Sequence, residues 1–340
     1  MRKAVIKELK LSNLLLLSFN RYLYILQNKQ DQIQQQSKAA FQKMKILKSY
    51  VWESNVFFDV IEKKNQLFIG EQKDVRLYNL NEFLAHNENN QNQEARILDL
   101  PAVKEYKNKK RLTMMRIAPS IETKDEIIEG LLMSDKVGEV RFLNIKNFIE
   151  GKKQSQVEED DLATTLFGHQ QECSGFQFST NSKFLASVDT LKRVRVCDFP
   201  NIFHVRQFHL YQKTEITDFA LNDSHLFTYS ALDQNLMISE LAGEKIIASE
   251  KQPQGFSIES LVTNQSTNQL CYLQSNQEKR TASVIQYQPD CRISNAVVQD
   301  IQINEGDKYT LATGGYLLNL RINPENGIIN GDEIDVMSLQ

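Results

Sequence analysis

The chain has 340 residues, of which 41% are hydrophobic and 24% are charged, a balance typical of folded soluble proteins. Its formal net charge of −3 excludes a chain that is basic throughout, so any nucleic-acid contact must come from a local patch or through a partner. The four cysteines have no CxxC spacing and no nearby histidine pair, which argues against a zinc site and favours free thiols in a reducing compartment.

The beginning of the sequence does not have the pattern of a targeting segment. The apolar run at 14–17 is short, charged residues precede it, Asn20 and Arg21 follow it, and no small-residue cleavage site appears. No apolar stretch approaches the ~20 residues of a membrane span. We therefore expect an intracellular protein without a membrane segment.

Short apolar, β-rich runs come in pairs, with a polar turn inside each pair. Seven pairs follow one another, at 14–26, 66–80, 130–145, 184–199, 226–241, 269–287 and 309–322. From the third pair onward they recur at about 40 to 55 residues, a period typical of propeller blades, each a four-stranded antiparallel sheet. One blade cannot bury both of its faces, so neighbouring blades stack around a central axis. The pattern predicts an all-β fold, a seven-bladed β-propeller that forms a single domain over 1–340, with almost no long helix.

Three polar segments interrupt this pattern and are interpreted as loop insertions. They lie near 28–38, 86–94 and 151–161, and are rich in Asn and Gln or in charged residues. Such segments cannot form a core, and they lengthen the spacing between hairpins.

The best-formed repeat is 167–200. It opens with Gly168-His169, continues through two β-rich runs to a turn at Asp189, and closes on a third run that ends in Cys197-Asp198. This is the WD-repeat pattern, with Cys197 where Trp is usual. In such repeats His169 and Asp189 can hydrogen-bond inside the blade, so a structural role for His169 is favoured over a catalytic one.

The segment 130–210 resembles one family within this class, the WD-repeat subunit of the tRNA (guanine-N7)-methyltransferase. Residues 132–140 (LMSDKVGEV) resemble its ADK-x-GDV segment, 166–169 (LFGH) its LLGH, and 184–189 with 193–196 its FILTAD and KIRV runs. Phe199-Pro200 and the run 208–210 resemble its next segment. The sequence departs from the family in the turn 189–193, and at Tyr211-Gln212, where the family has Gly-His.

The resemblance implies a non-catalytic scaffold subunit, in the nucleus, that forms a heterodimer with a class I methyltransferase. This chain would then hold no cofactor and no metal, and would contact tRNA mainly through the complex. The partner would bind S-adenosylmethionine and methylate N7 of a guanosine in the tRNA variable loop. In the family, the Lys of ADK and the Arg of KIRV face the catalytic partner, which implies partner-binding roles for Lys136 and Arg195, with Arg193 beside them. We expect these side chains on strand exteriors of adjacent blades, where the fold tolerates substitution.

A basic stretch raises the question of direct RNA contact. It comprises Lys104, Lys107, Lys109, Lys110, Arg111 and Arg116. These residues could contact tRNA phosphates, or they could belong to a solvated loop, because Glu105 dilutes the charge and only Tyr106 could stack on a base.

Motifs for catalysis are missing from the sequence. The 13 glycines include no G-x-G pair, and neither a P-loop, GxSxG nor HExxH occurs. The five histidines have no ligand spacing. Two alternatives to the methyltransferase subunit stay open: a WD-repeat adaptor of another complex, and a propeller hydrolase with a site at the axial channel.

Overall fold

A computed structural model of the chain describes most of its residues. The described residues are 5–9, 14–28, 42–85, 95–96, 100–151, 162–190, 193–209, 214–243, 245–252, 255, 257–264, 269–275, 280–287, 293–301, 307–312, 316–321 and 333–338. Almost all of the three predicted loop insertions lies outside them.

The described strands form five separate four-stranded antiparallel sheets and one larger sheet. The four-stranded sheets are β5 (Val56–Ile61), β6 (Gln66–Glu71), β7 (Asp74–Asn79) and β9 (Lys104–Lys107); β10 (Leu112–Ile117), β13 (Gly130–Asp135), β14 (Glu139–Asn144) and β15 (Ala163–Gly168); β16 (Cys173–Phe178), β17 (Phe184–Asp189), β18 (Val194–Asp198) and β19 (Val205–His209); β20 (Asp218–Leu221), β21 (His225–Ser230), β22 (Asn235–Glu240) and β23 (Lys245–Lys251); and β24 (Ser257–Asn264), β25 (Gln269–Ser275), β26 (Arg280–Tyr287) and β27 (Ile293–Ile301).

The eight-stranded sheet joins the two ends of the chain. It contains β1 (Val5–Leu9), β2 (Leu14–Phe19), β3 (Tyr22–Asn28), β4 (Gln42–Val51), β8 (Ala95–Arg96), β28 (Asp307–Ala312), β29 (Tyr316–Arg321) and β30 (Glu333–Ser338). The small hairpin of β11 (Ile121–Glu122) and β12 (Ile127–Ile128) stands apart from it. The helical elements described are α1 (Leu80–Ala85), α2 (Ile145–Glu150) and the 3₁₀ turn Glu62–Lys64.

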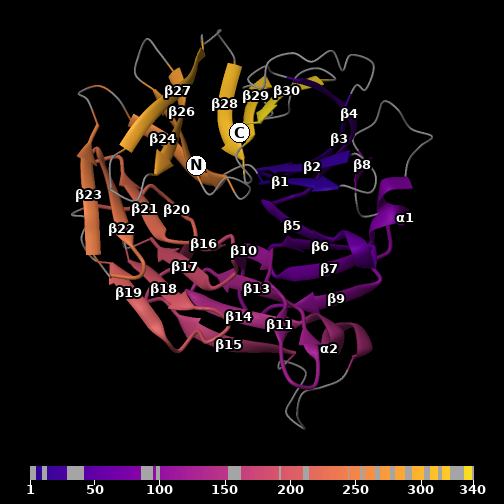
Figure 1. Cartoon of the computed structure of the whole chain (residues 1–340). Helices are drawn as coiled ribbons and strands as arrows, with labels where there is room; N and C mark the ends of the chain where they lie inside the picture. The colour runs from indigo at the N-terminus through magenta and orange to yellow at the C-terminus, as the bar shows by residue number, and fades with distance from the viewer. Residues whose placement is uncertain are drawn as a thin grey trace.

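The sheets follow one another around a ring in chain order (Figure 1), with β1, β5, β10, β16, β20, β24 and β28 nearest the centre. The predicted all-β propeller is therefore confirmed, and the described residues contain no long helix. The number of blades stays a prediction, since five sheets are separate and the remaining strands share one. The first six predicted pairs are the second and third strands of successive sheets, from β2–β3 to β25–β26, and the seventh is β28–β29.

Apolar side chains fill the spaces between neighbouring sheets. In β2 the consecutive leucines alternate, so that Leu15 and Leu17 pack toward β29 and β30 while Leu16 packs toward β5–β7. Further clusters lie between each following pair of sheets as far as β24–β27. Burial on both faces explains the consecutive apolar residues of strands such as β2, whereas outer strands such as β7 (DVRLYN) and β18 (VRVCD) alternate with polar residues.

The inner strands are also tied together by polar side chains. The buried Asp59 on β5 accepts from Lys7 Nζ on β1 at 2.8 Å and from the Ile117 amide on β10 at 2.9 Å. Asp218 on β20 accepts from the Leu261 amide on β24 at 2.7 Å. Charge-assisted hydrogen bonds of this kind hold neighbouring inner strands together near the axis.

The ring closes through one strand that pairs at both of its edges. Residues 44–51 of β4 pair with β3, and residues 42–45 pair antiparallel with β30. The N-terminal half of β4 is thus the strand that links the two ends of the chain. Neither six-residue α-helix is long enough to cross a membrane, and no other described helix could do so.

Candidate partner-docking site

The β13–β14 turn presents Lys136 to solvent. The buried Asp135 accepts from the amides of Val137 and Glu139, both at 3.0 Å, and so closes the turn. Gly138 has a φ of +92°, and a Cβ there would lie 2.3 Å from the Gln171 carbonyl oxygen. Glycine is therefore required at this position. Lys136 was expected on a strand, but it lies at the exposed tip of this turn.

His169 lies inside the next sheet. Its Nε2 is 2.9 Å from Ser187 Oγ, and its Nδ1 is 3.6 Å from the Asp189 carboxylate. The side chains of His169 and Asp189 are almost fully buried, at 2% and 1% exposure. Burial lowers the pKa of His169, while the Asp189 carboxylate acts in the opposite direction. The pair joins the strand that begins the repeat to the β17–β18 turn, as the WD pattern suggests.

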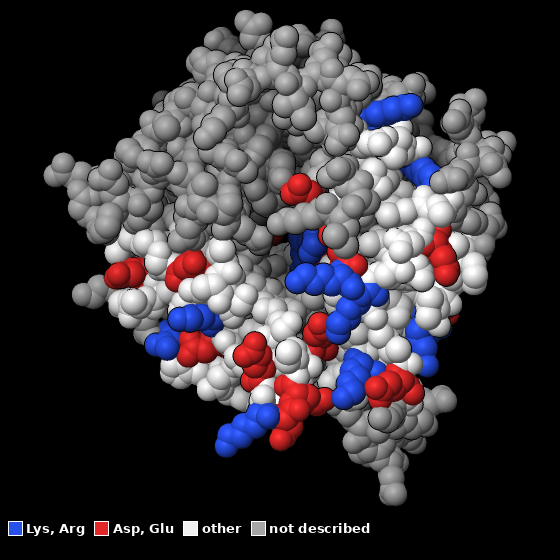
Figure 2. Space-filling model, turned by 45° about the vertical axis from the view of Figure 1, so that its right-hand side comes forward, with Lys and Arg blue, Asp and Glu red and all other residues white. Residues whose placement is uncertain are grey.

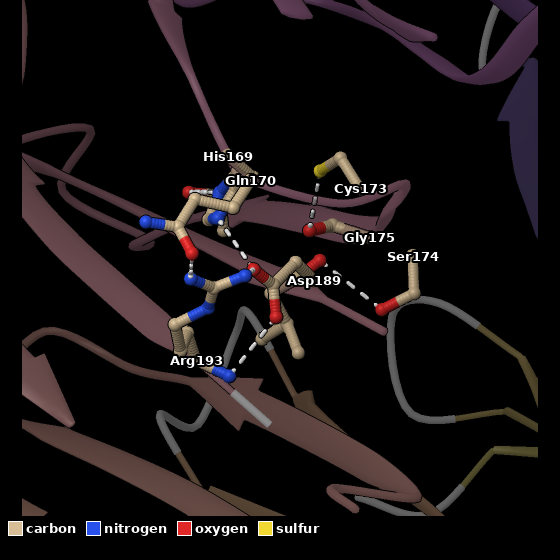
Figure 3. A network of polar contacts seen from close by, with 9 residues as sticks. His169, Gln170, Cys173, Ser174, Gly175, Asp189 and Arg193 are labelled. Carbon is tan, nitrogen blue, oxygen red and sulfur yellow. Dashed lines mark hydrogen bonds and ion pairs between the residues drawn. The ribbon is translucent and has the colours of Figure 1, made fainter. Parts of the chain in front are cut away.

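Arg193 completes this network (Figure 3). Its Nη2 is 2.8 Å from Asp189 Oδ2, and its backbone amide donates to Asp189 Oδ1 at 3.1 Å. Its Nη1 donates to Gln170 Oε1, so the guanidinium lies between the two side chains. Only 16% of the Arg193 side chain is exposed. The Arg193 guanidinium therefore interacts mainly with Asp189 and Gln170 of its own repeat, and little of it is open to solvent.

Arg195 connects two neighbouring sheets. Its guanidinium carbon lies 4.2 Å from the ring centroid of Phe167 on β15, a cation–π contact. Its Nη2 donates to the Ile202 carbonyl at 2.9 Å, while its buried Nε has no hydrogen-bond partner among the described residues. Arg195 is half-buried rather than a free exterior side chain.

Lys136 and Arg193 belong to one continuous edge. The His169 amide donates to the Gly138 carbonyl at 2.9 Å, which fastens 169–171 to the Lys136 turn. Gln170, in that segment, contacts Arg193. We call the surface formed by Lys136, Gln170 and Arg193 the docking edge. Arg195 lies behind it, between the sheets.

The predicted basic stretch separates into two parts. Lys109, Lys110 and Arg111 lie in the loop between β9 and β10, and the Lys136 amide donates to the Arg111 carbonyl at 3.0 Å. Arg116 lies on the inner strand β10, where burial lowers its pKa and the nearby Asp59 acts in the opposite direction. In the view of Figure 2, acidic and basic side chains lie next to one another, both near the middle of the ring and toward its rim.

Sequence reasoning did not single out the partners of these residues. Ser187, Gln170 and Phe167 have ordinary side chains for a strand or turn, and only their positions in the repeat could have indicated a role.

The described thiols are poor nucleophiles. Burial raises the pKa of Cys173 and of Cys197 to about 11, and that of Cys271 to about 12, and thiols must ionise to react. Within the described ranges, no group of three or more His, Cys, Asp or Glu side chains could hold a metal ion.

Comparison with known proteins finds one curated protein of similar sequence and no matching family model. The chain is 32% identical over 124 residues to the tRNA (guanine-N(7)-)-methyltransferase non-catalytic subunit wdr4 of Dictyostelium discoideum. The match includes 34% of this chain and 26% of that protein, so the chain spans about a quarter of the length of this curated relative.

Two solved structures are similar in fold. One, described as the crystal structure of the mitotic checkpoint complex, contains a chain with a TM-score of 0.62 and 11% identity, covering 100% of this chain and 89% of that one. The other, described as the structure of U3-55K, has a TM-score of 0.60 and 11% identity, covering 99% and 95%. At this identity the likeness concerns the fold alone.

Proposed function

We propose that this chain is the non-catalytic WD-repeat scaffold subunit of a tRNA (guanine-N7)-methyltransferase. The observation that carries the proposal is the 32% identity over 124 residues to a protein named as that subunit. The propeller fold agrees with a scaffold. The WD-type network of His169, Ser187 and Asp189 also serves the fold, which leaves these residues no evident catalytic use.

The catalytic subunit binds at the docking edge in this proposal. Lys136 is exposed at the tip of a turn whose shape is fixed by Asp135 and Gly138. A rigid, exposed cation suits an acidic side chain of a partner, and such a pair sets docking register and association rate more than affinity. Arg193 and Arg195 support the edge from within, and Arg193 keeps a small exposed portion for the partner.

The partner carries the chemistry. It binds S-adenosylmethionine and transfers the methyl group to N7 of a guanosine in the tRNA variable loop, while this chain stabilises the partner's active form by mass action. This chain binds no cofactor itself and meets tRNA mainly through the complex. We place the complex in the nucleus.

Seven blades suit this proposal. One apolar cluster packs β1–β4 against β29 and β30, as other clusters pack neighbouring four-stranded sheets. The eight-stranded sheet then consists of two blades joined through β4, with β1–β4 as the first blade and β28–β30 as the last.

Capture of partners by the tagged full-length chain tests the proposal. We expect a class I methyltransferase in the captured material, and N7-methylguanosine formation in tRNA only when both proteins are present. A different assembly without a methyltransferase would favour the adaptor alternative. Hydrolytic activity of the purified chain alone would favour the propeller hydrolase.

A charge-reversal variant tests the docking edge. Lys136→Glu should weaken capture of the methyltransferase about fivefold, because an exposed pair contributes roughly 1 kcal/mol. Lys63→Glu, at another exposed lysine, is the matched control. Thermal melts of both variants should match the wild type. Undiminished capture by Lys136→Glu would remove this residue from the interface.

A further inference from the structure

Four basic side chains that are distant in sequence gather beside the docking edge. Lys109, Lys110 and Arg111 are exposed in the loop between β9 and β10, and Lys73 is exposed in the β6–β7 turn. Backbone hydrogen bonds hold these two segments together: Asn108 N donates to the Lys73 carbonyl at 2.7 Å, and Leu112 N donates to the Gln72 carbonyl at 2.6 Å. We call Lys73, Lys109, Lys110 and Arg111 the basic patch.

Hydrogen bonds of the buried Asn108 and Arg141 hold the loop that carries the basic patch. The buried Asn108 donates through Nδ2 to the Lys110 carbonyl at 2.8 Å and accepts through Oδ1 from Arg141 at 2.9 Å. Arg141 also donates to the Tyr106 hydroxyl at 3.0 Å and to the Ala163 carbonyl at 2.8 Å. The backbone of the patch is thus ordered before any ligand arrives, which reduces the entropic cost of binding.

The acidic side chains near the basic patch form ion pairs with Arg76. Arg76 lies within 3.7 Å of Glu71, 3.3 Å of Asp74 and 3.0 Å of Glu105. Glu71 also accepts from the Ser54 amide at 3.2 Å. Among the described residues, Lys73, Lys110 and Arg111 form no ion pair, so their charges face solvent.

The composition of the patch favours phosphate over an acidic protein surface. Three of the four side chains are lysines, and none is apolar or aromatic, whereas the cores of protein interfaces are depleted in Lys and enriched in aromatic residues. Phosphate groups need only positioned positive charge. The patch also adjoins the docking edge, because the Lys136 amide donates to the Arg111 carbonyl.

We propose that the basic patch binds the sugar-phosphate backbone of an RNA, independently of its sequence, next to the site of the catalytic partner. The inference rests on the proposed function for the identity of the polymer, and on the structure for the place and mode of contact. The patch holds a distal part of the RNA while the partner holds the target base.

Fluorescence anisotropy of a labelled tRNA transcript with the full-length chain tests this. We expect a Kd of roughly 10⁻⁶ to 10⁻⁴ M that weakens steeply between about 50 and 200 mM salt. The patch variant Lys73→Gln, Lys110→Gln, Arg111→Gln should lose at least about tenfold in affinity near 100 mM salt. Its log Kd against log salt slope should fall by about two to three, because each lost contact removes roughly 0.7 to 0.9.

The matched control changes the same charge elsewhere. Lys63→Gln, Lys124→Gln, Lys183→Gln removes three exposed lysines outside the patch and should retain both affinity and slope. Equal losses in the two triple variants would overturn the proposal, as would no tRNA binding by the wild type at about 100 µM protein and about 50 mM salt. Equally tight binding of polyglutamate would also overturn it, in favour of an acidic protein.

The same variants separate this inference from the proposed function. Normal capture of the methyltransferase by the patch variant, together with weakened tRNA binding, supports the inference. Loss of capture by the patch variant would overturn it, since the patch would then be part of the protein interface. If the wild-type chain captures no methyltransferase but its tRNA affinity still depends on the patch, the proposed function alone fails.

Discussion

Asp189→Asn should lower the free energy of unfolding by about 3 kcal/mol. The buried carboxylate lies 2.8 Å from the Arg193 guanidinium, a separation at which two unit charges attract by roughly 6 kcal/mol with an effective dielectric constant near 20. Desolvation of both groups offsets part of this attraction. Asparagine retains an acceptor for the Arg193 amide but loses the charge and places a donor beside the guanidinium.

A double-mutant cycle in urea measures the pair. Asp189→Asn, Arg193→Met and the double variant should give a coupling energy of about 1 to 3 kcal/mol, with unchanged m-values. A loss below about 0.5 kcal/mol in Asp189→Asn, with no coupling, would refute the reasoning. Arg193 would then be held by neither Asp189 nor the sheet, and would be available to a partner in the way the family resemblance implies.

Three further changes test other parts of the site. Because the pKa of His169 is lowered in the folded chain, the unfolded chain takes up a proton at that side chain from about pH 6.5 downward while the folded chain does not. The free energy of unfolding should therefore fall with decreasing pH by up to about 1.4 kcal/mol per pH unit. His169→Gln should reduce this slope, as measured by urea unfolding at successive pH values. Arg195→Leu should cost about 1 to 2 kcal/mol in thermal melts because it removes the contact with Phe167 and the bond to a carbonyl; an unchanged Tm would instead support a free exterior side chain. Gly138→Ala should cost about 2 kcal/mol or more, since its Cβ would collide with the Gln171 carbonyl, and an unaltered denaturation midpoint would contradict the turn geometry.

The sequence was most informative where local pattern and tertiary environment agree. The predicted pairs correspond to hairpins such as β6–β7 and β17–β18 because the second and third strands of each sheet are joined by short polar turns. Apart from the run that became β16 in the best-formed repeat and β28 in the seventh pair, the first and fourth strands of the sheets were not assigned individually. Inner strands such as β16 contain residues with weak strand signals, Gly175 and Gln177, and Gln177 makes its side-chain hydrogen bonds to Leu221 and Thr263 in other sheets.

The sequence predicted one contact of the candidate site, between His169 and Asp189, but not the contacts of Lys136, Arg193 or Arg195. Motif order placed Lys136, His169, Asp189 and Arg193 in consecutive repeats, and the structure joins them through the segment 169–171. Nothing in a single strand sequence indicates that Arg195 stacks on an aromatic ring of the preceding sheet. The expectation that its substitution leaves the fold unaffected considered the strand alone, whereas the side chain spans two sheets.

The closure of the ring through β4 sets the order in which the chain can finish folding. Residues 42–45 pair with β30, which follows about 290 residues later in the sequence. A ribosome adding roughly 5 to 20 residues per second needs about 15 to 60 seconds to reach that strand. Throughout this interval the outer edge of β4 presents unpaired backbone groups, the kind of edge that recruits foreign strands. The pairing that closes the ring therefore forms only after β30 has been synthesised, and until then this edge of β4 is open to pairing with other strands.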